Sequence, residues 1–196
     1  MPLHLPPAPT PALRCVLAAL GSPTAVREAP VSALRAHQGP LSPDHPLPVH
    51  VWEDVSRTGG VPRTRLAGWR FLVRGGERAV ATAEAVLTAD GWTFARFCGG
   101  PYLAATEQAL SQAESLATPY QPRLLSVPEL YMLTLWLHHD LTSDGTEGLA
   151  APGDLLVPLA PAPPGIAAHR PQRIADLLPR LTLRLTPATP LLAEPA

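Results

Sequence analysis

The sequence predicts an α+β fold, in which an antiparallel meander sheet carries one main packed helix and proline-rich flanks lie at both ends. The first observation is the placement of the 26 prolines: eleven lie in residues 1–48, ten in 152–196 and only five between them. Each proline removes a backbone donor from a helix or strand interior, so the regular structure is expected in the centre. The second observation is an apolar alternation from Val49 onward, and the third is one long amphipathic run after Gly99-Gly100.

The length of 196 residues suits one domain with a core of its own. We therefore expect one folded unit with an appendage at each end. The predicted segments are an N-terminal extension, an α+β core domain and a C-terminal extension, with bounds 1–47, 48–160 and 161–196.

The N-terminal extension carries the signals of two short helices. Thr10-Pro11 suits a helix start, apolar residues then recur at helical spacing, and a glycine follows at the C-cap position, which predicts a helix over residues 10–20. A second brief helix is expected over residues 31–38. Pro40–Pro48 is interpreted as an irregular linker, because prolines and turn residues interrupt any pattern there.

The core domain is expected to begin with a run of strands. Period-two alternation predicts them, and Gly75-Gly76 and Asp90-Gly91 supply turn signals between them. The expected strands are 49–55, 69–73, 78–87 and 92–98.

Small side chains mark one face of the third of these strands. Ala79, Ala81, Ala83 and Ala85 alternate along it, and small residues let a helix approach a sheet closely. We expect this face to pack against the main helix, predicted over residues 101–117.

The second half of the core is interpreted as further strands. Residues 123–127 and 130–138 are rich in large apolar residues and are separated by a proline, which favours bulged strands over a helix. Residues 154–159 are expected to pair back across the loop 142–153.

The C-terminal extension has two weaker signals. Ile174 begins a helical pattern that Pro179 is expected to stop. Beyond it, leucines alternate with polar residues, which predicts an edge strand over residues 181–186.

Composition limits the partners. The net charge is −1, so the whole molecule has no bulk attraction for nucleic acid or an acidic membrane. Cys15 and Cys98 are too few for a disulfide framework, and no signal peptide or membrane span is indicated. We expect a cytoplasmic protein without a cofactor, and no membrane partner.

Charge segregation is the clearest anomaly. Residues 57–78 carry six arginines against one acid, while 107–154 carry seven acids against one arginine. Together with interleaved tryptophans, the basic segment has the features of an arm that contacts phosphates and stacks on bases. Alternatively, its arginines meet the acidic half of the same chain or of a second copy. The candidate binding residues are Arg57, Arg63, Arg65, Trp69, Arg70 and Arg74.

Two constellations raise the alternative of a small enzyme. Cys98 precedes Gly99-Gly100 at a strand-to-helix junction, where a helix N-terminus lowers a thiol pKa. His138 and Asp140 form a same-side pair suited to a metal, but no third ligand is defined and the spacing matches no standard signature. We therefore predict no catalytic and no metal-ligating residues.

These observations favour a non-enzymatic interaction protein, which binds a protein partner or assembles with itself. Nucleic-acid binding through residues 57–78 is the first alternative, and an enzyme using Cys98 or His138 with Asp140 is the second.

Overall fold

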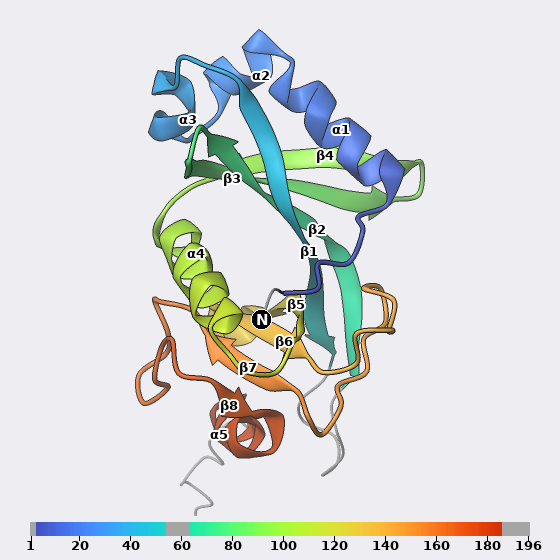
Figure 1. Cartoon of the computed structure of the whole chain (residues 1–196), viewed down its shortest axis with the longest axis vertical. Helices are drawn as coiled ribbons and strands as arrows, with labels where there is room; N and C mark the ends of the chain where they lie inside the picture. Colours follow the sequence, from blue (N-terminus) through green and yellow to red (C-terminus); the bar gives the residue numbers. More distant parts are fainter. Residues whose placement is uncertain (1–2, 54–62, 186–196) are drawn as a thin grey trace, which may run out of the picture.

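The computed structural model describes residues 3–53 and 63–185, which form an α+β fold with five α-helices and one mostly antiparallel sheet (Figure 1). The strand order is β4-β3-β2-β1-β5-β6-β7-β8. The helices are α1 (Thr10–Leu20), α2 (Pro23–Glu28), α3 (Ser32–Ala36), α4 (Pro101–Glu114) and α5 (Ile174–Leu185), with a 3-10 turn η1 (Pro128–Leu130). The strands are β1 (Leu41–Glu53), β2 (Arg63–Gly75), β3 (Arg78–Thr88), β4 (Gly91–Cys98), β5 (Gln121–Val127), β6 (Met132–His138), β7 (Leu155–Pro158) and β8 (Gln172–Arg173).

The predicted meander is confirmed. Strands β1 to β4 pair antiparallel in sequence order, and β5, β6 and β7 do the same in the second half. One pairing differs, because β1 also runs parallel to β5 over Val49–Val51. The helix α4 makes this parallel pair possible, since it carries the chain from the β4 edge back to the middle of the sheet.

The interpretation of Pro40–Pro48 as a linker is wrong, because Leu41–Glu53 is one long strand. Proline cannot donate to a neighbouring strand. Pro43 and Pro48 pair with β2 on one side only, and the other side of β1 gains its neighbour β5 from Val49 onward. Among the described residues, no strand lies on the other side of β1 before Val49, so a proline there removes no inter-strand hydrogen bond on that side.

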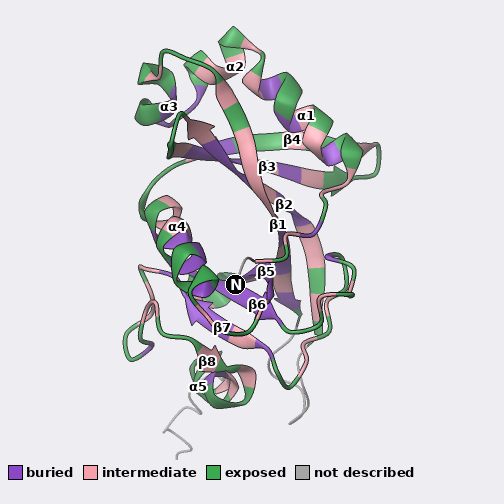
Figure 2. Ribbon diagram, viewed as in Figure 1, coloured by how far each residue is buried: buried purple, intermediate pink, exposed green. Residues whose placement is uncertain are grey.

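Helices cover both faces of the sheet. α1, α2 and α3 pack over β2, β3 and β4 around Ala12, Val16 and Leu34, while α4 packs over the other face around Ala109 and Leu110 (Figures 1 and 2). The N-terminal segment predicted as an extension thus contributes fully buried residues to the core.

The small-residue face of β3 faces a different helix from the one predicted. Ala81, Ala83 and Ala85 are fully buried in the cluster that α1 covers, and only Ala79 packs on the α4 side. An irregularity in the β2–β3 register beside Arg74 moves Ala79 to the opposite face. A helix does pack closely on this alanine face, but that helix is α1 and not α4.

The C-terminal segment continues as a helix through Pro179. Leu177 and Leu181 are fully buried, and together with Ile174, Leu178 and Leu185 they pack on β5, β6 and β7. The free energy gained by burying these apolar side chains offsets the loss of the one backbone hydrogen bond that Pro179, which is exposed, cannot form. The predicted stop at Pro179 is therefore wrong, and so is the predicted edge strand 181–186 over residues 181–185; residue 186 lies outside the described residues. No helix in the described part of the chain is long and apolar enough to cross a membrane.

Candidate functional site

The start of the predicted basic segment is only partly described. Arg57 lies outside the described residues. Arg63 is exposed at the first position of β2, and the Nε atom of Arg65 lies 3.7 Å from a carboxylate oxygen of Glu53 on β1. Both Arg65 and Glu53 are about half exposed or more, so this pair contributes little to stability.

The later arginines of the segment form cross-strand ion pairs. Arg70 on β2 and Arg96 on β4 both bond to Glu84 on the strand between them, at 2.5 Å and 2.8 Å. Burial acts to raise the pKa of Glu84, but the two guanidinium groups hold it below its usual range. Arg74 pairs with Asp44 at 2.6 Å. These arginines thus meet acids of their own sheet, and their role toward a partner stays a prediction.

Trp69 does not offer a stacking surface. Its side chain is 1% exposed and packs in the cluster covered by α1. Trp69 and Phe71 lie on the same face of β2, and that face is the buried one. The prediction that Trp69 stacks on the bases of a nucleic acid is therefore wrong.

Cys98 lies at the end of β4, before the glycines that lead into α4. Burial raises the pKa of its thiol, so the thiol stays protonated at neutral pH. A nucleophilic cysteine needs the opposite shift. Gly99 is required for packing, since a Cβ there would lie 2.9 Å from a methyl carbon of Val31.

His138 and Asp140 are not brought together. His138 Nδ1 lies 2.9 Å from Asp154, whereas Asp140 accepts hydrogen bonds from the backbone amide and hydroxyl of Thr142. No group of three metal-ligating side chains occurs within residues 3–53 and 63–185.

A different set of polar side chains forms the most unusual site of the molecule. All its members are 4% exposed or less and lie on β1, β5 and β6 and directly before β7, under the connection from β6 to β7. This buried polar cluster consists of His50, Gln121, Arg123, His138 and Asp154.

Arg123 is the centre of the cluster. Its guanidinium donates to the backbone carbonyl oxygen atoms of Glu147 and Asp144 and to the hydroxyl of Ser143, and its Nε donates to Gln121 at 2.8 Å. Gln121 in turn donates to the carbonyl of Ser143 at 2.9 Å. One buried cation thus satisfies several polar groups of the loop above it.

The charge of Arg123 is only partly compensated. Burial lowers its pKa to about 10, while the carboxylates of Asp154 and Glu147 act in the opposite direction. Its guanidinium lies 5.0 Å from the ring centroid of Trp136, within cation–π range. The group remains charged at neutral pH and holds the loop through charge-assisted hydrogen bonds.

His50 ties the same loop to β1. Its Nε2 must carry the proton, because it faces the carbonyl of Gly145 at 3.0 Å. The hydroxyl of Thr64 donates to the carbonyl of Gly148 at 2.9 Å and lies 3.2 Å from Nδ1, which carries no proton in this tautomer of the neutral ring. Burial lowers the pKa of His50 to about 4, and the charge of Arg123 acts in the same direction.

Asp154 closes the other end of the loop. Its carboxylate accepts hydrogen bonds from Trp136 Nε1 at 2.7 Å, from His138 at 2.9 Å and from the backbone amides of Ala151 and His139. Burial acts to raise the pKa of Asp154, and these four donors hold it below its usual range. The carboxylate is therefore a structural anchor that stays ionised.

The cluster holds one loop in a defined shape. We call residues 140–147 the acidic loop, since Asp140, Asp144 and Glu147 are exposed on it. The Asp140 and Asp144 carboxylates each cap a backbone amide two residues ahead, and Glu147 accepts from a serine hydroxyl within the loop. The carboxylates are consequently fixed in position while they remain open to solvent.

Sequence reasoning missed most of this cluster. The one signal was Arg123, the single basic residue in the acidic segment 107–154. A lone arginine on a strand otherwise rich in apolar residues indicates a buried cation with loop partners, but its partners are up to 24 positions away.

Comparisons with known proteins found nothing similar to this chain. No family model matches it, and neither a curated protein nor a solved structure does.

Proposed function

We propose that the protein is a non-enzymatic interaction protein, which binds a protein partner or assembles with itself, and that the acidic loop is its recognition surface. The observation that supports this is the use of a fully buried arginine to hold a loop whose carboxylates point to solvent. Burying a charge is costly unless its hydrogen bonds are satisfied. A loop held in this way is ordered before it meets a partner and loses little entropy on binding.

The charges of the loop define its partner. Three exposed carboxylates within eight residues favour a basic surface, and their fixed positions favour a specific geometry. The buried polar cluster supports the same proposal, because its ionisable groups are engaged in holding the loop. We place this function in the cytoplasm, since both cysteines are free thiols, which suits a reducing compartment.

Site-specific crosslinking in living cells tests the proposal. A photo-crosslinking amino acid at Thr146, which is exposed on the loop, should form one or a few adducts of defined mass. The same group at Gln112, exposed on α4, is the matched control position and should form none at comparable yield.

Charge-neutral variants show whether recognition depends on the carboxylates. Asp140→Asn, Asp144→Asn and Glu147→Gln together keep the acceptor atoms that cap the loop but remove its charge. The adducts at Thr146 should fall by about tenfold, since each exposed ion pair is worth up to about 1 kcal/mol. Adducts of unchanged yield, or equal yield at Gln112, would contradict the proposal.

A further inference from the structure

A positively charged surface of the described chain lies on the outer side of α5, on β8 and on the residues just before β8. Four exposed arginines lie within fifteen residues, and one acid, Asp176, accompanies them. No ion pair joins these arginines to an acid in residues 3–53 and 63–185; Arg184 instead donates to the carbonyl of Pro164. We call this surface the basic face; its arginines are Arg170, Arg173, Arg180 and Arg184.

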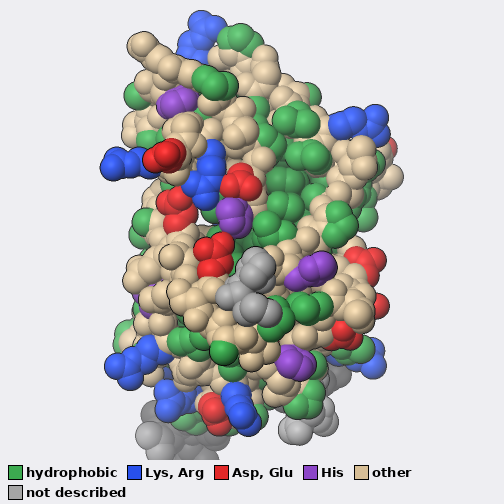
Figure 3. Space-filling model, viewed as in Figure 1, with side chains coloured by type: hydrophobic (Ala, Val, Ile, Leu, Met, Phe, Trp, Pro, Cys, Tyr) green, Lys and Arg blue, Asp and Glu red, His purple; other side chains and the backbone are tan. Residues whose placement is uncertain are grey.

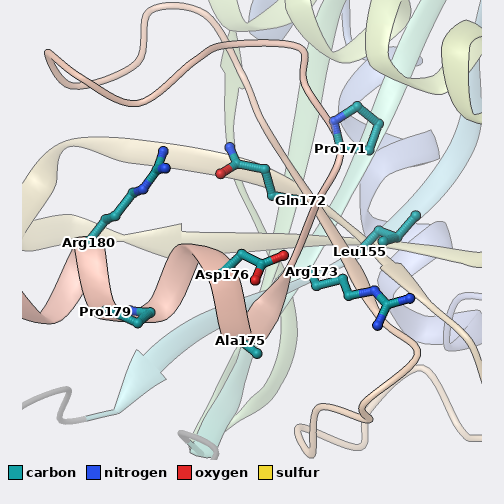
Figure 4. A pocket seen from close by; sticks show the side chains of 8 residues that line it. All are labelled: Leu155, Pro171, Gln172, Arg173, Ala175, Asp176, Pro179 and Arg180. Atoms are coloured by element: carbon teal, nitrogen blue, oxygen red, sulfur yellow. The ribbon is translucent and has the colours of Figure 1, made fainter.

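The basic face contains an open hollow. It has a volume of about 860 Å³ and lies between β8 and α5, with Leu155, Pro171 and Pro179 among its lining residues. Figure 4 shows Arg180 rising from α5 beside the hollow and Arg173 extending from β8, with Asp176 between them. The two guanidinium groups come from different elements and lie on opposite sides of Asp176 in this view.

The acidic loop and the basic face are complementary in charge and lie on different parts of the molecule. In Figure 3 the arginines gather at the lower end, over α5, while acidic side chains gather at the right-hand margin, where Figure 1 places the β6–β7 connection. Among the described residues, no ion pair connects the two surfaces within one chain.

We propose that the acidic loop of one copy docks into the hollow on the basic face of a second copy. This proposal rests on the function proposed above and identifies the partner of the acidic loop as a second copy of the same chain. The two surfaces are different, so the contact is head-to-tail, and repetition gives a ring or an open chain. The connection that Arg123 and His50 hold in shape supplies the acidic surface, and the open hollow between β8 and α5 supplies the basic one.

Asp176 sets the orientation of the contact. Loop carboxylates that approach Arg173 and Arg180 must avoid the carboxylate between them, which disfavours all but a few placements. Asp176→Asn removes this repulsion and should strengthen self-association several-fold, whereas a structural role in α5 alone predicts no change in association.

Complementary variants test the contact. The loop variant carries Asp140→Asn, Asp144→Asn and Glu147→Gln; the helix variant carries Arg173→Gln and Arg180→Gln. In sedimentation velocity, the wild type should associate with concentration, and more weakly at high salt. Each variant alone should associate about tenfold more weakly. A mixture should form a one-to-one pair and nothing larger, because each variant keeps one working surface.

A matched control removes two exposed arginines elsewhere. Arg14→Gln with Arg27→Gln changes the net charge by the same amount on α1 and α2, and should leave association unchanged. A mixture of the loop and helix variants that stays monomeric would overturn the head-to-tail contact.

Other occupants of the basic face are outcomes of the same experiment. A wild type that is monomeric, but is shifted by a single-stranded oligonucleotide or by anionic vesicles in a way that the helix variant abolishes, would overturn the second copy as the partner. A monomeric wild type that still gives charge-dependent adducts at Thr146 would also overturn it, while leaving the proposed function standing with a different basic protein.

Discussion

At the scale of single residues, ionisable groups inside the molecule act as supports for the chain around them. Arg123 and Asp154 are both 0% exposed, and each bonds to a backbone group at least 15 positions away in sequence. A buried charge is tolerable only when such hydrogen bonds replace water. The stability of the loop therefore depends on a few side chains below it.

Replacement of Arg123 by Met tests this dependence. Met keeps an unbranched apolar stem but leaves the carbonyl groups of Asp144 and Glu147 without a donor. We expect the free energy of unfolding to fall by about 2–4 kcal/mol. Urea denaturation measures the loss, and amide hydrogen exchange of residues 143–148 should accelerate more than that of α1. Unchanged exchange in the loop would contradict the anchoring role.

His50 links stability to pH. Its pKa is near 4 in the folded chain and 6.5 in the unfolded one, so the unfolded chain takes up the proton first as the pH falls. Stability should decline between pH 6.5 and 4 by up to about 3 kcal/mol and change no further from this group below pH 4. His50→Gln should flatten the decline across this window in urea titrations. Carboxylates with lowered pKa values, such as Asp154 and Glu84, begin to lose their contribution at the lower end of that window and continue to lose it below pH 4.

At the scale of elements, the connection between β6 and β7 is in direct backbone contact with β2. The carbonyl of Gly148 accepts from the backbone amide of Thr64 at 3.2 Å, and a Cβ on Gly148 would lie 2.1 Å from the carbonyl oxygen of Thr64. The glycine is therefore needed for space.

Gly148→Ala should force the acidic loop away from β2. We expect a loss of about 2–3 kcal/mol in unfolding free energy, from lost hydrogen bonds and displaced backbone. Chemical denaturation checks the loss. Gly21→Ala is the control, because its nearest contact would be an ordinary 3.4 Å, and it should be close to neutral. Equal effects of the two substitutions would argue against the close approach.

α5 contains Pro179 in its interior, where a proline is unfavourable because it has no backbone N–H. Pro179→Ala should restore the missing backbone donor and raise the free energy of unfolding by about 1–3 kcal/mol. Thermal unfolding measures the change. Pro171→Ala lies before the helix and should have a small effect of opposite sign, since there the proline restricts only the unfolded chain. A loss of stability on Pro179→Ala would mean that the ring packs in a way that alanine cannot replace.

At the scale of the whole molecule, the N-terminal helices cover the sheet that the centre of the chain forms. Trp69, Phe71 and Val73 are 1% exposed or less, and they lie in one cluster with residues of α1, α2 and α3. The sheet alone would leave this surface open to water.

A chain that starts at Pro40 should therefore fail to fold cooperatively. Removal of the helices exposes several large apolar side chains, each worth about 1.5–3 kcal/mol of burial. Near-ultraviolet circular dichroism of the tryptophans and sedimentation should reveal lost packing and aggregation. A monomeric, cooperatively unfolding truncated chain would instead support the predicted division at residue 47.

Elements with strong local signals could be predicted from the sequence. The turns at Gly75-Gly76 and Asp90-Gly91, the alternation in β2, β3 and β4, and the helix after Gly99-Gly100 all appear where expected. In each, neighbours in the chain decide the conformation, because turn geometry and side-chain period are local properties. The sequence by itself therefore determined the α+β class and the order of most elements.

Tertiary structure alone decided the rest, since the deciding neighbours are distant in sequence. Pro43 is tolerated in β1 because no strand lies on its open side, and α5 continues past Pro179 because its leucines are buried. The role of Arg123 depends on the folded position of the acidic loop, whose carbonyl groups accept its hydrogen bonds. Burial and hydrogen-bond satisfaction outweigh local preferences, which reach about 3 kcal/mol for a proline inside a helix, and both depend on the complete fold.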